Sequence, residues 1–248
     1  MNRTARLVLS LVAGGGIAAV LLLAVLGLPH FGGSAHSYRD AAVPAAVRHV
    51  TSNVISSINF DLRGLDTLGE ETILLASVVG AAVLLRPADD EEVHVPAESG
   101  RDLDSTRLFG TMFLPVTLVI GLLTVAHGAL TPGGGFQGGV VLGSGLHLLY
   151  VAGSYRALDR LRPLHAFHWG EALGAGAFAC FGVATALAAT AFLGNLLPLG
   201  AFGELFSSGS VLLLSGAVGV EVASGTVVLL GSFLTQAIAI RPREGGRR

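Results

Sequence analysis

Runs of about 20 apolar residues dominate this sequence, and a helix of that length can cross about 30 Å of hydrocarbon. The composition fits a membrane environment, because 52% of the 248 residues are hydrophobic and only 13% are charged. An ordinary soluble domain carries about 25% charged residues. We therefore expect an integral membrane protein with an all-α, polytopic fold, a lipid bilayer around it and no nucleic-acid partner.

Six of these runs are bounded by charged or turn residues and predict about six transmembrane helices. They cover residues 7–28, 68–85, 108–130, 137–155, 171–193 and 210–234. If the N-terminus lies in the cytoplasm, all arginines fall on the cytoplasmic side except Arg39, Arg48 and Arg63. Because basic loops stay in the cytoplasm, both termini are predicted to be cytoplasmic.

The first 28 residues admit a second interpretation. Arg3 and Arg6 precede an apolar run, as in a secretory signal peptide. The run is longer than a signal core of about 7–15 residues, so a retained helix is favoured. Cleavage would leave five spans.

A charged segment without apolar periodicity divides the spans into two groups. It predicts a two-helix unit over residues 1–86, an acidic cytoplasmic linker over 87–104, a four-helix unit over 105–240 and a basic cytoplasmic tail over 241–248. The linker contains the run DDEE, residues 89–92, which is interpreted as solvated acid rather than as a metal site.

Glu221 lies near the centre of the sixth predicted span, and ionisable groups in hydrocarbon are costly and tend to mark function. On a helix it shares a small, polar face with Ala217, Ser224 and Gly225, which allows a neighbouring helix to approach. Glu221 is predicted to relay protons or cations; a neutral glutamate hydrogen-bonded to another helix is the alternative. Glu171 begins the fifth predicted span, where the helix dipole would stabilise a carboxylate.

Two histidines are further candidates for an ion or proton path. His147 follows Gly139 and Gly143 at helical spacing, a pattern that supports close helix packing. Its imidazole could carry protons near neutral pH, but a packing histidine is the more frequent case. His127 lies at the outer end of the third span, and for it both interpretations stay open.

Charged residues also crowd the outer end of the second predicted span. They are Asp61, Arg63, Asp66, Glu70 and Glu71. Thr67 and Glu70 match a capping box, which would give Glu70 a structural role. The other charges predict an interfacial segment whose carboxylates capture a hydrated cation.

The chain between the third and fourth spans reads TPGGGFQGG, residues 131–139. Pro and Gly predict a tight turn, and the absence of a following lysine in this sequence excludes a P-loop. There are more glycines than a turn needs, so they are expected to dock another helix; an ion-path role for His127 and Gln137 is the second interpretation. The packing and turn residues are Thr131, Pro132, Gly133, Gly134, Gly135, Gly139 and Gly143.

Two long motifs resemble known families of membrane subunits. HGALTPGGGFQGGVVLGSGLHLLYVAG and GVEVASGTVVLLGSF are similar to the B subunit of Mrp-type multisubunit sodium/proton antiporters, and the resemblance covers about residues 105–240. NFDLRGLDTLGEETILLASVVGAAVLL resembles the C-terminal part of the large Mrp A subunit, over about residues 50–86. Related membrane-bound hydrogenases carry that segment as a separate small protein.

The resemblance implies a non-autonomous subunit of a bacterial cytoplasmic membrane complex that exchanges Na⁺ for H⁺. Its expected partners are the large A and D subunits and the small C, E, F and G subunits. No cofactor, metal or enzymatic activity is expected. The alternatives are a membrane component of an energy-converting hydrogenase or related redox complex, and a purely structural adaptor. Fusion of an A-like segment to a B-like unit suggests a partner large subunit with a shorter C-terminus.

Overall fold

The structure is a computed structural model that describes residues 3–28, 32–34, 36–85, 91–93, 104–152, 164–188, 191–234 and 238–240. The described chain is mostly helical, which confirms the expected all-α membrane fold. It divides into two compact units, residues 1–41 and residues 42–248.

The first unit contains α1 (Arg3–Leu26) and the beginning of α2 (Ser37–Arg48). Helix α1 is apolar from Leu7 to Leu26. In α2 the guanidinium of Arg39 pairs with the carboxylate of Asp40, 2.8 Å away.

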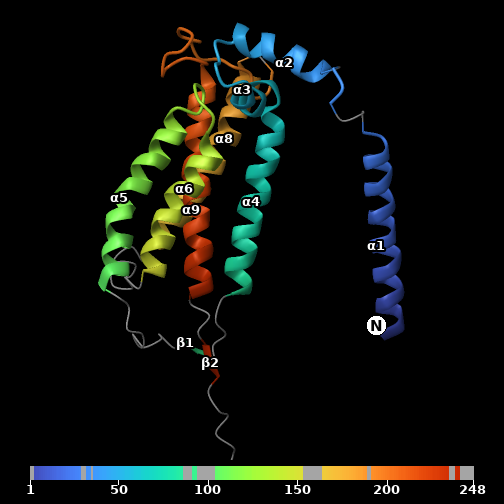
Figure 1. Ribbon diagram of the computed structural model, residues 1–248, viewed down its shortest axis with the longest axis vertical. Helices are drawn as coiled ribbons and strands as arrows, with labels where there is room; N and C mark the ends of the chain where they lie inside the picture. Colours follow the sequence, from blue (N-terminus) through green and yellow to red (C-terminus); the bar gives the residue numbers. More distant parts are fainter. Residues whose placement is uncertain are drawn as a thin grey trace, which may run out of the picture. The chain divides into compact units, whose positions relative to one another are not determined.

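The second unit is a helical bundle, which Figure 1 shows with the long helices side by side. Its elements after α2 are α3 (Val54–Ser57), the π-helix η1 (Ile58–Leu62), α4 (Gly64–Leu84), α5 (Asp104–Ala126), α6 (Gly135–Val151), α8 (Leu164–Leu187) and α9 (Ser210–Leu234). Helix α9 packs against α6, α8 and α4, and α5 packs mainly on α6. Two short strands, β1 (Glu91–Val93) and β2 (Ile238–Ile240), pair antiparallel.

Five of the described helices are long and apolar enough to cross a membrane. They contain Leu7–Leu26, Gly64–Leu84, Ser105–Ala126, His165–Leu187 and Ser210–Phe233. About six crossings were expected; α6 occupies the predicted span 137–155 but has only 17 residues, about 26 Å at the rise of an α-helix. Residues 153–155 lie outside the described residues, as do the tail 241–248 and the predicted linker apart from β1 and Asp104.

Helix α9 is the centre of the bundle, since 61% of its apolar window is buried, against at most 28% in the other four helices long and apolar enough to cross a membrane. Glycines of α6 lie directly against it. A Cβ atom on Gly139 would lie 2.7 Å from Cβ of Val222, and one on Gly135 would overlap the carbonyl of Ser215. Helix α8 meets the other side of α9 in the same way, through Gly174. Close approach of backbones is the usual way in which helices associate in lipid.

We expect Gly139→Leu to destabilise the bundle, because the new side chain would force α6 and α9 apart. The loss should be about 1–3 kcal/mol, as for other overpacked cores, and should lower the melting temperature of the purified protein in detergent. Gly176→Leu is the matched control, because no atom lies within 4 Å of a Cβ at that position of α8. Equal melting temperatures would contradict a packing role for Gly139.

Candidate functional site

Three glutamates from three helices lie inside the bundle. Glu71 of α4, Glu171 of α8 and Glu221 of α9 are each at most 1% exposed. Within the described residues, no hydrogen bond of standard geometry reaches either carboxyl oxygen of Glu71 and Glu221, or Oε1 of Glu171. The carboxyl groups interact instead with one another, Glu221 with both Glu71 and Glu171. We term these three residues the carboxylate ladder.

The ladder's members lie at successive depths. Helices α4 and α9 run in the same direction, and Cγ2 of Val78 lies 3.2 Å from the Cβ position of Gly225. Glu71 is two turns before Val78 on α4, so its backbone lies about one turn nearer the N-terminal ends of α4 and α9 than Glu221 does. Oε1 of Glu171 lies 3.5 Å from the Cβ position of Gly225, about one turn further along α9 than Glu221. The level of Glu71 and the level of the Glu171 carboxyl oxygen are therefore roughly 10.5 Å apart along the axis of α9.

Local sequence explains why the helices can place the ladder there. A Cβ atom on Gly174 would lie 2.7 Å from Cβ of Glu221, so only a glycine lets α8 and α9 meet at this level. Apolar side chains on the same two helices are buried as well: Phe178 of α8 and Val228 of α9 are 0% exposed. The ladder is thus enclosed by protein in the middle of the predicted membrane region.

Burial restricts the charge that the ladder can hold. Several buried carboxylates cannot all be ionised beside one another unless a cation neutralises them. Among the described residues there is no group of three His, Cys, Asp or Glu side chains that could surround one metal ion. Of neighbouring buried carboxyl groups, at least one is expected to be protonated, and such a group can pass its proton to a neighbour.

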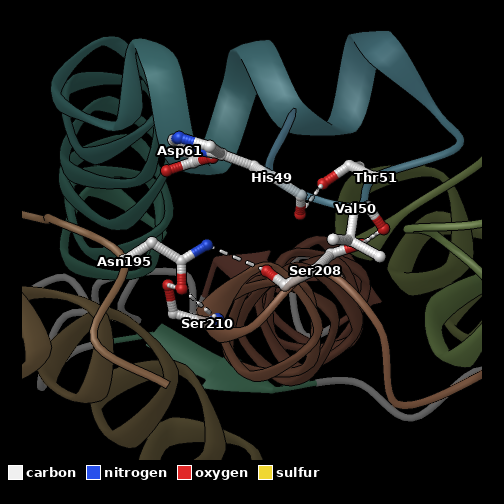
Figure 2. A network of polar contacts seen from close by, with 7 residues as sticks. All are labelled: His49, Val50, Thr51, Asp61, Asn195, Ser208 and Ser210. Carbon is white, nitrogen blue, oxygen red and sulfur yellow. Dashed lines mark hydrogen bonds and ion pairs between the residues drawn. The ribbon is translucent and has the colours of Figure 1, made fainter. Parts of the chain in front are cut away.

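A polar network ties the chain together at the predicted outer end of the bundle (Figure 2). It comprises His49, Val50, Thr51, Asp61, Asn195, Ser208 and Ser210. The imidazole of His49 pairs with the carboxylate of Asp61 in η1. Ser208 donates its hydroxyl to the carbonyl of Val50, 3.2 Å away, and Oδ1 of Asn195 accepts from the backbone N–H of Ser210 at 2.9 Å. The last contact caps the N-terminus of α9.

Asn53 joins the A-like segment to the glycine-rich hairpin. Its amide Nδ2 donates to the carbonyls of Gly128 and Thr131, at 2.8 and 2.9 Å. Its backbone N–H donates to the carbonyl of Ala129 at 3.0 Å, while its Oδ1 caps α3 by accepting from Ile55 N–H. One side chain thus fixes the position of α3 relative to the turn between α5 and α6.

The charged residues near the start of α4 do not form one cluster. Asp61 pairs with His49, Arg63 pairs with Asp66, and Glu70 is exposed. Among the charged residues of α4 itself, only Glu71 is buried in the bundle.

The predicted capping box at Thr67 and Glu70 is wrong, because α4 already begins at Gly64. Thr67 lies inside the helix, and its hydroxyl donates to the carbonyl of Asn59 at 2.7 Å.

Glu171 was expected in a first helical turn, and this too is wrong. Helix α8 begins at Leu164, so Glu171 lies two turns into the helix and the helix dipole does not account for it. Sequence reasoning therefore missed it as a site residue, although Gly170 and Gly174 flank it at the spacing of a close helix contact. His49 and Asn53 were also missed, and nothing in their local sequence marks them.

The remaining candidates lie elsewhere. Nδ1 of His127 is 3.0 Å from the carbonyl of Leu123 on its own helix, and Gln137 is exposed. Nε2 of His147 is 3.3 Å from the carbonyl of Thr226, on the side of α9 that faces α6. The ladder lies on the side of α9 that faces α8 and α4.

Fold and site together define a multi-pass membrane protein with buried acidic residues, a combination typical of ion and proton pathways. Residues 106–228 match the family described as "Domain related to MnhB subunit of Na+/H+ antiporter". Residues 1–99 match the MbhE family, described as the E subunit of MBH. Each of the two matches covers less than half of this chain.

Two curated proteins are similar to this chain in sequence. An uncharacterized protein of Methanocaldococcus jannaschii is 26% identical over 205 residues, which is 71% of this chain and 75% of the relative. The A/B subunit of a probable K(+)/H(+) antiporter of Rhizobium meliloti is 27% identical over 139 residues, which is 48% of this chain and 14% of the relative. The chain thus corresponds to a small part of that second protein.

Two solved membrane complexes contain chains with the same fold. One belongs to the membrane-bound sulfane sulfur reductase, an archaeal respiratory membrane complex, with a TM-score of 0.69, 24% identity and coverage of 92% of this chain and 98% of that one. The other belongs to the Mrp complex from Dietzia sp., with a TM-score of 0.66, 23% identity and coverage of 94% of this chain and 26% of that one.

We expect Glu71→Gln to leave the free energy of unfolding unchanged or to raise it by up to about 1 kcal/mol. The melting temperature should then be equal to that of the wild type or higher. The amide can donate a hydrogen bond to the carboxyl group of Glu221, which has none of standard geometry within the described residues. Ser210→Ala is the control and should lower stability by about 1 kcal/mol, since it removes the hydroxyl donor to Oδ1 of Asn195 at 3.0 Å. A marked loss in Glu71→Gln would mean that Glu71 holds a stabilising cation.

Proposed function

We propose that this chain is a non-autonomous membrane subunit of a multisubunit cation/proton antiporter, in which the carboxylate ladder relays protons. The observation that carries the proposal is the burial of Glu71, Glu221 and Glu171 at successive depths, in mutual interaction. A structural adaptor has no need of buried carboxyl groups, which are costly in a membrane. The two family descriptions, each naming a subunit, support membership of a larger assembly.

Proton transfer along the ladder needs little movement. Each step covers about one helical turn, a distance that a flexible glutamate side chain or one water molecule can bridge. Glu221 is the common partner in both steps, so it must accept a proton from one neighbour before passing it to the other. Glu71, Glu171 and Glu221 are at most 1% exposed, so water has little access to them. The ends of the path are therefore expected at contacts with other subunits.

The proposed partners are the large A and D subunits and the small C, E, F and G subunits, in a bacterial cytoplasmic membrane. The likeness to a chain of the Dietzia Mrp complex supports a place among such membrane proteins. Glu71 belongs to the MbhE domain, whereas Glu171 and Glu221 belong to the MnhB-related domain. Both family domains are therefore needed for the relay.

The test is cation-dependent proton exchange in inverted vesicles of an antiporter-deficient strain that expresses this chain with its partner subunits. We expect Glu221→Gln and Glu171→Gln each to abolish exchange, since an amide cannot release a proton. Glu204→Gln, in an exposed loop, is the matched control and should exchange like the wild type. Na⁺ and K⁺ are tested separately, because the family description names Na⁺ and the Rhizobium relative names K⁺.

Each variant complex is purified to show that its subunits are all present. Normal exchange by an assembled Glu221→Gln complex would contradict the relay. A wild-type complex that exchanges neither cation would favour the second candidate, a membrane component of a redox complex. That candidate is motivated by the match over nearly the whole length of a chain from a respiratory complex.

A further inference from the structure

Helix α4 has a second face, opposite the one that carries Thr67, Glu71 and Val78 into the bundle. Residues on it recur at helical spacing and are exposed, or partly exposed in the case of Gly80. They are Asp66, Gly69, Glu70, Ile73, Ala76, Ser77, Gly80 and Leu84. We term this set the exposed α4 face.

The exposed α4 face is more polar than a lipid contact requires. Asp66 lies near the outer end of α4 and pairs with Arg63, and both side chains are about half exposed. Glu70 lies one turn deeper and forms no ion pair with any residue whose side chain the structure describes. A carboxylate that points into hydrocarbon is costly, so such residues turn toward protein or water. Contact of this face with lipid alone would therefore be energetically unfavourable.

The same face is shaped for close contact with another helix. A Cβ atom on Gly69 or Gly80 would meet no atom within 4 Å, so both glycines leave unfilled surface. Ala76 and Gly80 are four residues apart, the spacing at which small residues let two helix backbones approach. The hydroxyl of Ser77 donates to the carbonyl of Ile73 at 2.7 Å, so it needs no partner from outside.

We propose that a transmembrane helix of another protein in the complex covers the exposed α4 face and places a cationic or hydrogen-bond-donating side chain against Glu70. Charge complementarity selects this occupant. A lipid tail offers no donor. A second copy of this chain, related by a two-fold axis along the membrane normal, would bring like charges together at the same depth.

The contact would also affect the carboxylate ladder, and this part of the inference rests on the proposed function. Glu70 interacts electrostatically with Glu71, the outermost member of the ladder. A cation held at Glu70 would offset that like charge. The partner helix would thereby influence proton occupancy at the outer end of the relay.

The test places a benzophenone photocrosslinking residue at Ile73, which is 69% exposed at the centre of the face. In the complete complex we expect ultraviolet light to join this chain to one other membrane protein of the complex, identified by mass spectrometry. The control is the same labelled chain expressed without its partners, which should give no protein adduct. Absence of an adduct with another protein in the assembled complex, or an adduct with a second copy of this chain, would overturn the proposal.

The charge at Glu70 is tested in the same labelled complex. Glu70→Arg should lower the adduct yield about tenfold or more, which corresponds to about 1.4 kcal/mol, whereas Glu70→Gln, which still accepts hydrogen bonds, should retain it. Glu204→Arg, in an exposed loop, is the matched control. An unchanged yield in Glu70→Arg would overturn the assignment of a cationic or donor group. The crosslinking yield does not depend on transport activity. A negative exchange assay would therefore leave the proposed helix contact standing, and a negative crosslinking result would leave the proposed relay standing.

Discussion

Direct contact between the backbone of α9 and those of α6 and α8 is the interaction on which the rest of the structure depends. Lipid supplies no hydrophobic force to drive helices together, so association rests on close packing. Gly135 and Gly139 on one side and Gly174 on the other remove the side chains that would separate the helices. Helix α9 becomes the most buried span as a result. The proposed carboxylate ladder depends on that burial, because Glu221 is a residue of α9.

Because Glu221 is buried, it lies at the centre of the candidate site. In an exposed position its carboxylate could reach water; between α4 and α8 its neighbours are two other carboxyl groups. The end of the bundle that carries α3 is held differently, by polar contacts: Asn53 binds the α5–α6 turn, and Ser208 binds the carbonyl of Val50. Val50 and Ser208 both have positive φ, 58° and 72°. Backbone strain of this kind persists only where surrounding contacts impose it.

Sequence reasoning succeeded where a signal is local. Apolar runs located the long helices, and position within a run singled out Glu221. The errors share one cause, since an apolar run marks the part of a helix that matches hydrocarbon and not its polar ends. Helix α8 begins at Leu164, before the apolar run, and α4 begins at Gly64. Both shifts moved a polar residue from a helix terminus into the interior, which is why Thr67 and Glu171 received the wrong explanations.

The sequence by itself determined the membrane class, the all-α fold and the resemblance to antiporter subunits, because length, hydropathy and long motifs are properties of consecutive residues. Only the tertiary structure decided which carboxylates meet. Glu71, Glu171 and Glu221 lie far apart along the chain, and the residues next to each one do not indicate the other two. Glu70 and Glu71 illustrate the point: they are neighbours in sequence, but one faces outward and the other joins the ladder, because about 100° of helix rotation separates them.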